Sequence, residues 1–316
     1  SIDYIGVQII KTSDATCVSM EKYIDKMVAD LLQLGMTLNT RVVLVPLSEP
    51  IDTDSELLDA KGIRLFLTGL GCMAWCSHTV RVDCSQAFSR LGQHSAKPTV
   101  SELKGLTHAV SHLYQHKNLC LTQKLFPEDL DLMPVFDINA PSKGFEFRLY
   151  ADSDHAGNTE VQNKRRSQNG GVCMVGDAVF DWSSKASSVT FATELIGEAH
   201  ADMSSGAVEV YAAGNATIDI LDNMYLFEEA GVEFPKPFTL LVDNTTAEAF
   251  MNCTVKRSKL KHIDCRQEWC KMLRNKKIVL PEHVDTDNNL ADLETKILGS
   301  EPFVRLRNQM MVPFSV

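Results

Sequence analysis

The sequence predicts an α/β domain with a mixed sheet in the second half of the chain, preceded by a mainly helical domain in the first half. Two observations predict this division. Apolar residues recur every three to four positions through much of the first 125 residues, whereas from residue 145 they alternate with polar residues, as on strands. Between these regions, residues 126–143 contain three prolines and a polar end, which is typical of a linker. We therefore predict domains at 1–140 and 141–316.

The first domain is expected to be a helical bundle with little strand. Met20–Met36 is its clearest helix, because the apolar residues share one face and Gly35 can end the helix. Val42–Pro46 is a short apolar run, followed by an acidic loop. Helical spacing resumes over Ile63–Trp75 and Val100–Leu119.

The second domain is expected to open with three antiparallel strands. Phe145–Ala151 alternates apolar and polar residues, and a Gly176–Asp177 turn typical of a hairpin joins Gly171–Val175 to Ala178–Trp182. Helices and strands then alternate, which suits an α/β domain with a mixed sheet. These later segments are a helix over Ser205–Leu226, a strand over Phe238–Val242, a helix over His262–Arg274, a strand over Ile278–Pro281 and a helix over Asn288–Ile297.

Composition places the chain among globular, intracellular proteins. Its 316 residues, 44% of them hydrophobic, can bury ordinary cores. No apolar run reaches the roughly 18 residues of a membrane span, and the first residues do not have the pattern of a signal peptide. We therefore expect no membrane span. The nine cysteines are odd in number and include no C-x-x-C pair, so we expect reduced, mostly buried thiols.

Charge limits how the chain can contact nucleic acid. The formal net charge of -10 argues against nonspecific coating of nucleic acid, so any basic surface must be local. Residues 256–277 form such a basic segment, and Lys164–Arg166 is a shorter one. Basic runs are often only solvated faces, and a lone histidine is as often a capping or packing residue. The candidates for nucleic-acid contact are Lys256, Arg257, Lys259, Lys261, His262 and Arg266.

Three aspartates lie at the ends of predicted elements. Asp152 ends the first strand, Asp243 ends the later buried strand, and Asp292 lies at the start of the last helix. A compact sheet can bring such ends together, and hard divalent cations bind clusters of carboxylate oxygens. Two ions about 3.5–4 Å apart can activate water for phosphodiester hydrolysis. Each aspartate alone could instead form a turn or cap a helix.

Six segments of the second half resemble, in order, the motifs of the RNase H domain of copia-type LTR retrotransposon Pol polyproteins. The resemblance implies an RNase H-like mixed sheet with flanking helices, and Mg²⁺-dependent (or Mn²⁺-dependent) cutting of the RNA strand of RNA–DNA hybrids with two ions. The segments are RLYADSDHAGN (148–158), KRRSQNGGVCMVGDAVFDWSSK (164–185), SSGAVEVYAAGNA (204–216), LLVDNTTAEAF (240–250), KLKHIDCRQEW (259–269) and NNLADLETKIL (288–298).

The same resemblance implies the catalytic and metal-binding residues. The family's aspartates in Y-S-D-A-D-W-A-G, D-N-Q-S-A and L-A-D-I-x-T-K fall on Asp152, Asp243 and Asp292. The chain departs from the family's T-E-A-E-Y stretch. Ala207 stands at the position of the first glutamate, and only the second glutamate is matched, by Glu209. We take Glu209 as the fourth ligand. The alternatives are Glu198 or Asp202, or a site that lacks its glutamate and is weakened.

The first half resembles the end of a copia-type reverse transcriptase, its thumb and connection, through IDYIGVQI (2–9), SMEKYIDKMVADLLQLGM (19–36), VPLSEP (45–50) and GLGCMAWCSHTVRVDCSQAFSRL (69–91). We expect the palm and fingers upstream in the same polyprotein, in a cytoplasmic virus-like particle. The alternative is a domesticated, catalytically weakened protein that a host retained as a structural or binding subunit of a larger complex. Its partners would then be host protein subunits, in an organelle or elsewhere.

Overall fold

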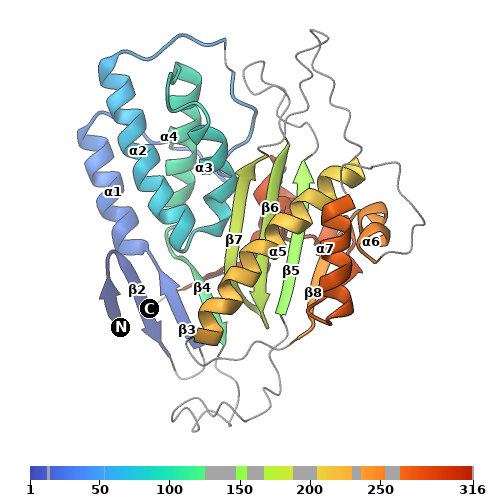
Figure 1. Ribbon diagram of the computed structural model, residues 1–316. Helices are drawn as coiled ribbons and strands as arrows, with labels where there is room; N and C mark the ends of the chain where they lie inside the picture. The colour runs from blue at the N-terminus through green and yellow to red at the C-terminus, as the bar shows by residue number, and fades with distance from the viewer. Residues whose placement is uncertain are drawn as a thin grey trace. The chain divides into compact units, whose positions relative to one another are not determined.

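A computed structural model describes residues 1–12, 15–52, 54–124, 147–154, 167–187, 205–229, 236–252 and 264–314 (Figure 1). The described residues divide into two units. The first holds those of 1–125 and 296–316, and the second holds those of 126–157 and 166–295. Each unit contains a five-stranded sheet. The predicted boundary near residue 140 lies outside the described residues.

The first unit has the predicted helices, and side chains cap the start of two of them. Asp59 caps α2, since its Oδ1 accepts a 2.7 Å hydrogen bond from the Gly62 amide. Thr99 and Glu102 form a capping box at the start of α4. A short 3-10 helix, η1 (Val82–Cys84), joins α2 to α3. The helices are α1 (Glu21–Gln33), α2 (Ala60–Thr79), α3 (Ser85–Gly92) and α4 (Val100–Gln115).

The prediction of little strand in the first half is wrong. An antiparallel sheet in the order β1-β2-β3-β4-β10 belongs to this unit, whereas Val42–Pro46 forms no strand. The strands of this sheet are short, and β1 exposes all its residues, so β1 lacks the alternation that identifies a strand in a sequence. The strands are β1 (Ile2–Tyr4), β2 (Val7–Lys11), β3 (Ala15–Ser19), β4 (Leu119–Lys124) and β10 (Val312–Pro313).

The C-terminal residues belong to the first unit, although the sequence placed them in the second domain. Helix α9 (Ser300–Met310) buries Phe303, whose ring meets the His112 ring of α4 edge-on with centroids 5.7 Å apart. After α9, β10 pairs with β4, and the Phe314 amide donates to the Asn118 carbonyl oxygen. Apolar burial and strand pairing therefore hold the end of the chain in this unit.

The second unit confirms the predicted α/β class with a five-stranded mixed sheet. The strand order is β7-β6-β5-β8-β9; β5, β6 and β7 are antiparallel neighbours, and β8 and β9 run parallel to β5. Gly176, with a positive φ of 58°, forms the predicted hairpin turn between β6 and β7. The strands are β5 (Phe147–Asp154), β6 (Gln168–Val175), β7 (Ala178–Ala186), β8 (Phe238–Val242) and β9 (Val279–His283).

One face of this sheet forms a core with α5 and α7, and Figure 1 shows α5 crossing the strands. Ala216 of α5 is small enough to approach β6 closely: a Cβ atom added at Gly171 would lie 3.0 Å from its methyl group. Leu149, Leu240 and Leu273 are buried in the same core. The helices are α5 (Ser205–Glu229), α6 (Thr245–Met251), α7 (Asp264–Asn275) and the single-turn α8 (Asp292–Thr295), which the 3-10 helix η5 (Thr286–Asn288) precedes.

Helix α8 packs directly on β6 at Gly170. A Cβ atom added there would lie 2.7 Å from Glu294 Cβ and from Thr295 Cγ2, and 3.0 Å from the Ala291 carbonyl oxygen. Two of these atoms belong to α8, so a larger side chain at Gly170 would push the helix away from the strand. Only glycine fits at this position without displacement.

Gly170→Ala is therefore expected to lower the free energy of unfolding of the second unit by about 1–3 kcal/mol, the usual effect of overpacking a core. Gly71→Ala is a matched control: nothing lies within 4 Å of a Cβ added at this exposed position in α2, so alanine should stabilise by roughly 0.5–1 kcal/mol. Urea unfolding followed by circular dichroism measures both changes. Equal stability of Gly170→Ala and wild type would contradict the close packing of α8.

Among the described residues the cysteines are thiols, and most of them are buried, as the sequence predicts. Cys17, Cys76, Cys84, Cys120 and Cys173 are buried, whereas Cys72 and Cys270 are partly exposed. Within the described ranges, no helix combines the length and the hydropathy that crossing a membrane requires.

Candidate active site

Parallel pairing places two of the predicted aspartates side by side. Strands β5 and β8 run parallel, with Tyr150 opposite Leu241. Continuing this register by two residues places Asp152 level with Asp243. Strand β8 ends at Val242, so Asp243 follows it directly, and Asn244 then caps α6 by accepting hydrogen bonds from the amides of Thr246 and Ala247. The carboxyl end of a strand is the usual location of a site in an α/β sheet.

Asn289 holds the start of α8 against β5. Its side chain is fully buried; Nδ2 donates to the Ala151 carbonyl oxygen at 3.2 Å, and Oδ1 accepts from the Ala291 amide at 3.2 Å. Because Asp292 begins α8, these two hydrogen bonds bring its carboxylate to the same edge of the sheet as Asp152.

The three aspartates converge as the sequence predicts. Each of Asp152, Asp243 and Asp292 offers a carboxylate oxygen, and these oxygens lie within 4.8 Å of one another. Asp152 is 1% and Asp292 5% exposed, while Asp243 is partly exposed. Three negative charges at this separation repel one another, and repulsion is stronger away from bulk water. A cluster of buried carboxylate oxygens fits a hard cation such as Mg²⁺ or Mn²⁺.

Glu209 is not among the three converging carboxylates, although it lies near the start of α5 with its side chain only 6% exposed. The next residue, Val210, packs against Ala247 and Phe250 of α6, the helix that follows Asp243. This packing fixes the start of α5 beside α6. The alternatives Glu198 and Asp202 lie outside the described residues.

The predicted nucleic-acid contacts fall mostly outside the described residues. Lys256, Arg257, Lys259, Lys261 and His262 lie there, and Arg266 is described only as part of the α7 helix. The remainder of the basic segment is exposed at the end of α7 and just after it, at Lys271, Arg274, Lys276 and Lys277.

Sequence reasoning gave no role to Thr295. Its Oγ1 hydrogen-bonds Asp152 Oδ2, and both side chains are buried. The signal was present in the sequence, because Thr295 follows Asp292 by three residues and residues at this spacing share a helix face.

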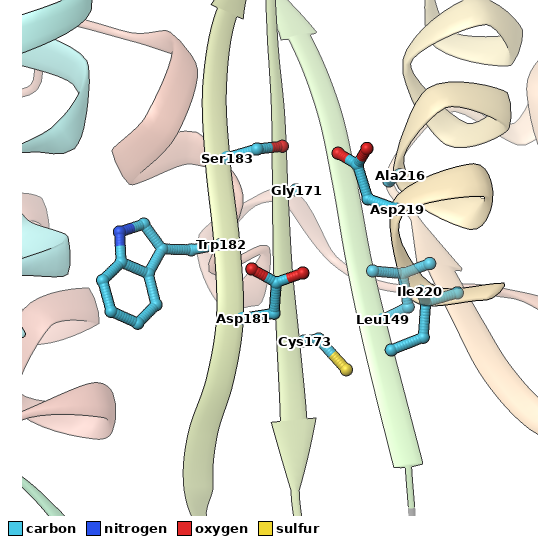
Figure 2. Close-up of a pocket in the computed structure, with 9 residues that line it drawn as sticks. All are labelled: Leu149, Gly171, Cys173, Asp181, Trp182, Ser183, Ala216, Asp219 and Ile220. Carbon is cyan, nitrogen blue, oxygen red and sulfur yellow. The ribbon is translucent and has the colours of Figure 1, made fainter. Parts of the chain in front are cut away.

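A pocket between β7 and α5 contains two further carboxylates, Asp181 and Asp219 (Figure 2). Asn223 Nδ2 donates to Asp181 Oδ2 at 2.6 Å, and Lys185 Nζ lies 3.2 Å from Asp219 Oδ2. Burial raises the pKa of Asp181. Because each carboxylate already has its own partner, we interpret the pocket as a packing feature.

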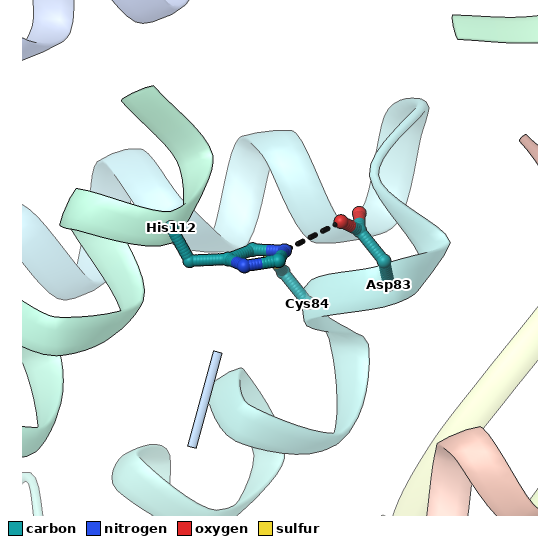
Figure 3. A group of neighbouring side chains, drawn as sticks. All are labelled: Asp83, Cys84 and His112. Carbon is teal, nitrogen blue, oxygen red and sulfur yellow. Dashed lines mark hydrogen bonds and ion pairs between the residues drawn. The ribbon is translucent and has the colours of Figure 1, made fainter. Parts of the chain in front are cut away.

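A second cluster in the first unit also combines metal-ligand residue types, namely Asp83, Cys84 and His112 (Figure 3). The Arg81 guanidinium supplies the positive charge that a metal ion would supply there. Its Nε and Nη2 donate to the two oxygens of Asp83 at 2.8 and 2.7 Å. His112 Nε2 lies 2.9 Å from Asp83 Oδ2. The cluster is therefore a buried ion-pair network that ties η1 to α4.

Two curated relatives agree with the resemblance in the sequence. No family model matches the chain. The Pol polyprotein of the Arabidopsis thaliana transposon RE1, described as retrovirus-related, is 22% identical over 98% of the chain, and that of RE2 is 22% identical over 95%. The chain spans about a fifth of the length of these relatives, 19% and 18%.

Two solved RNase H structures also align with the chain. The N-terminal RNase H domain of a Mycobacterium tuberculosis protein, solved as a fusion with maltose-binding protein, aligns over 52% of this chain and 97% of its own, with 15% identity and a TM-score of 0.34. An RNase H1 isolated from compost by a metagenomic approach aligns over 48% and 92%, with 12% identity and a TM-score of 0.29. From the sequence relatives, which match nearly the whole chain, we conclude that its homologues include retrovirus-related Pol polyproteins of Arabidopsis copia-type transposons.

Proposed function

We propose that the second unit is a ribonuclease H that cuts the RNA strand of RNA–DNA hybrids. One observation carries the proposal: the carboxylate oxygens of Asp152, Asp243 and Asp292 lie within 4.8 Å of one another at one edge of the five-stranded mixed sheet. The similarity to retrovirus-related Pol polyproteins supports the proposal, because the motifs in the sequence resemble the RNase H domain of such polyproteins.

The three aspartates would hold two Mg²⁺ or Mn²⁺ ions, which when bound supply an activated water and stabilise the leaving oxygen of the phosphodiester. Asp152 and Asp292 are buried and fixed by β5 and α8, so their carboxylates present oxygens in a set arrangement. Partial exposure of Asp243 leaves one side of the cluster open for the scissile phosphate. Water is the nucleophile, so no side chain of the protein needs to attack the phosphate.

We propose Glu209 as the fourth ligand. Its burial near α6, which follows Asp243, supports this assignment over residues farther along α5. Glu209→Gln is expected to reduce the rate of hybrid cleavage about tenfold to a hundredfold at low Mg²⁺, because one negative ligand is lost. Steady-state cleavage across a Mg²⁺ titration measures this. If Glu198→Gln or Asp202→Asn has this effect and Glu209→Gln does not, the fourth ligand is assigned to the wrong residue.

Phosphate contacts are proposed for Lys256, Arg257, Lys259, Lys261, His262 and Arg266. The exposed basic residues that follow them at the end of α7 support a locally basic surface on a chain with a net charge of -10. Selectivity for hybrids would come from A-form-like shape and 2′-hydroxyl contacts.

The first unit is proposed to be the thumb and connection of the reverse transcriptase, with the palm and fingers as its partner in the same polyprotein. Near-complete alignment of the chain with two Pol polyproteins supports this assignment. Action inside a cytoplasmic particle is part of the same proposal.

A second candidate function is binding without cutting, as a structural subunit retained by a host. The observation that favours it is the absence of a fourth carboxylate in the cluster of aspartates among the described residues, together with Ala207 at the family's glutamate position. This candidate predicts that the chain binds a hybrid and leaves it intact.

Cleavage specificity tests the proposed function. An RNA–DNA hybrid, an RNA duplex and a DNA duplex of one sequence are incubated with the chain and Mg²⁺, with either strand end-labelled. We expect cuts in the RNA strand of the hybrid and none in the two duplexes. Cutting of the DNA strand, or equal cutting of all three, would refute ribonuclease H activity.

A further inference from the structure

We propose that Thr295 is a positioning residue that sets the orientation of the Asp152 carboxylate and thereby the affinity of the site for divalent cations. The inference rests on the proposed function, since it concerns the same site. It assigns a role to a side chain that does not itself belong to the aspartate cluster.

The hydrogen bond of Thr295 has a defined direction. Three oxygens surround its hydroxyl: Asp152 Oδ2, the Ala291 carbonyl at 3.3 Å and the Asp292 carbonyl at 3.4 Å. A hydroxyl has one hydrogen to donate, and Asp152 Oδ2 is the nearest of the three acceptors. Donation to a carboxylate is charge-assisted and stronger than donation to a neutral carbonyl. Thr295 therefore donates to Asp152.

Burial makes this hydrogen bond important for the orientation of Asp152. Asp152 is 1% exposed and Thr295 is not exposed at all, so bulk water has little access to this carboxylate oxygen. A carboxylate rotates about its last bond with little resistance unless its oxygens are held. Thr295 holds one oxygen and so fixes the plane in which Asp152 presents its lone pairs.

The backbone of α8 is itself fixed, so Thr295 is a rigid donor. Asn289 ties the start of α8 to β5 through the Ala151 carbonyl oxygen, and Thr295 Cγ2 packs on Gly170. Gly170 lies opposite Asp152 in the β5–β6 ladder. One turn of helix thus carries the ligand Asp292 and, three residues later, the residue that orients the ligand Asp152.

Two substitutions separate the hydroxyl from the methyl group. Thr295→Val removes the hydrogen-bond donor and keeps the packing on Gly170, whereas Thr295→Ser keeps the donor and removes the methyl group. We expect Thr295→Val to weaken Mn²⁺ binding about tenfold to a hundredfold, as the loss of a group that orients a metal ligand does, and Thr295→Ser to bind within about threefold of wild type.

Mn²⁺ binding to the full chain, measured by electron paramagnetic resonance of the free ion, is the readout, with Asp152→Asn as the blank for other sites. Thr217→Val is a matched control, because Thr217 is also buried but its hydroxyl donates to the Ala213 carbonyl oxygen, at 2.7 Å in α5. We expect its Mn²⁺ affinity to equal that of wild type. If Thr295→Val does not fold, Thr295→Ala removes the same hydroxyl without filling its place.

The outcomes separate this inference from the proposed function. Wild-type Mn²⁺ affinity in Thr295→Val, or weak binding by Thr295→Ser and not by Thr295→Val, would show that Thr295 only packs and would overturn the inference. A wild-type chain that binds no Mn²⁺ would overturn it as well. Mn²⁺ binding that depends on the Thr295 hydroxyl, in a chain that leaves hybrids intact, would support the inference and refute the nuclease.

Discussion

Asp152→Asn is expected to lower the rate of hybrid cleavage about a thousandfold, because losing a ligand of the ions removes several kcal/mol of charge stabilisation and each ~1.4 kcal/mol is a factor of ten. Asparagine has nearly the same shape and can still accept the Thr295 hydrogen bond, so the fold should persist. Single-turnover cleavage of a labelled hybrid in Mg²⁺ measures the rate, and circular dichroism verifies folding. Asp243→Asn should behave in the same way.

Asp219→Asn is the control for these variants. Asp219 is also an acidic residue of the second unit, but it pairs with Lys185 and does not belong to the aspartate cluster. Its replacement should leave the cleavage rate unchanged. Full activity in both Asp152→Asn and Asp243→Asn would mean that the converging aspartates do not carry the reaction.

Asp83→Asn is expected to destabilise the first unit by about 3–5 kcal/mol, because it leaves the buried Arg81 without its counter-charge. The Arg81 and Asp83 side chains are fully buried, and no water can replace the lost carboxylate. Hydrogen exchange in peptides from α2 and α4 reports the free energy of unfolding of this unit. Asp3→Asn is the control, since Asp3 pairs with Lys22 at the surface and should change stability little. Equal effects of the two substitutions would contradict the network.

Acid should reveal the same ion pair. Burial alone would raise the pKa of Asp83, but the Arg81 guanidinium and His112 hold this pKa well below its usual range. A carboxyl group whose pKa is depressed in the folded state contributes stability that is fully present above its unfolded pKa of about 4. This stability is lost progressively as the pH falls from that value through the lower, folded-state pKa. Asp83→Asn should lack this part of the acid dependence.

Much of the second unit was predictable because its elements carry local signals. Strand β8 has the predicted bounds, Phe238–Val242, and a glycine at a positive φ turns the predicted hairpin. Convergence of Asp152, Asp243 and Asp292 followed from their places at element ends, although β5 continues past Asp152 to Asp154. The last predicted helix, Asn288–Ile297, is instead a 3-10 turn and one turn of α-helix.

Long-range pairing accounts for what the sequence did not predict. The first-unit sheet joins strands from the start of the chain to β4 and to β10 near the end of the chain. A local sequence pattern does not predict pairing between residues so far apart. The hydrogen bond from Thr295 to Asp152 is likewise a contact between distant segments. The identity of the fourth ligand rests on one position, Ala207, at which this chain departs from the family motif.

Mg²⁺-dependent cleavage of an RNA–DNA hybrid is the most direct measurement. The purified chain is incubated with a hybrid labelled on its RNA strand, with Mg²⁺ in one sample and with a chelator in the other. The three converging aspartates predict RNA fragments with Mg²⁺ and an intact strand without it. An intact RNA strand in both samples, from a folded chain that binds the hybrid, would contradict the nuclease and leave binding without cutting as its function.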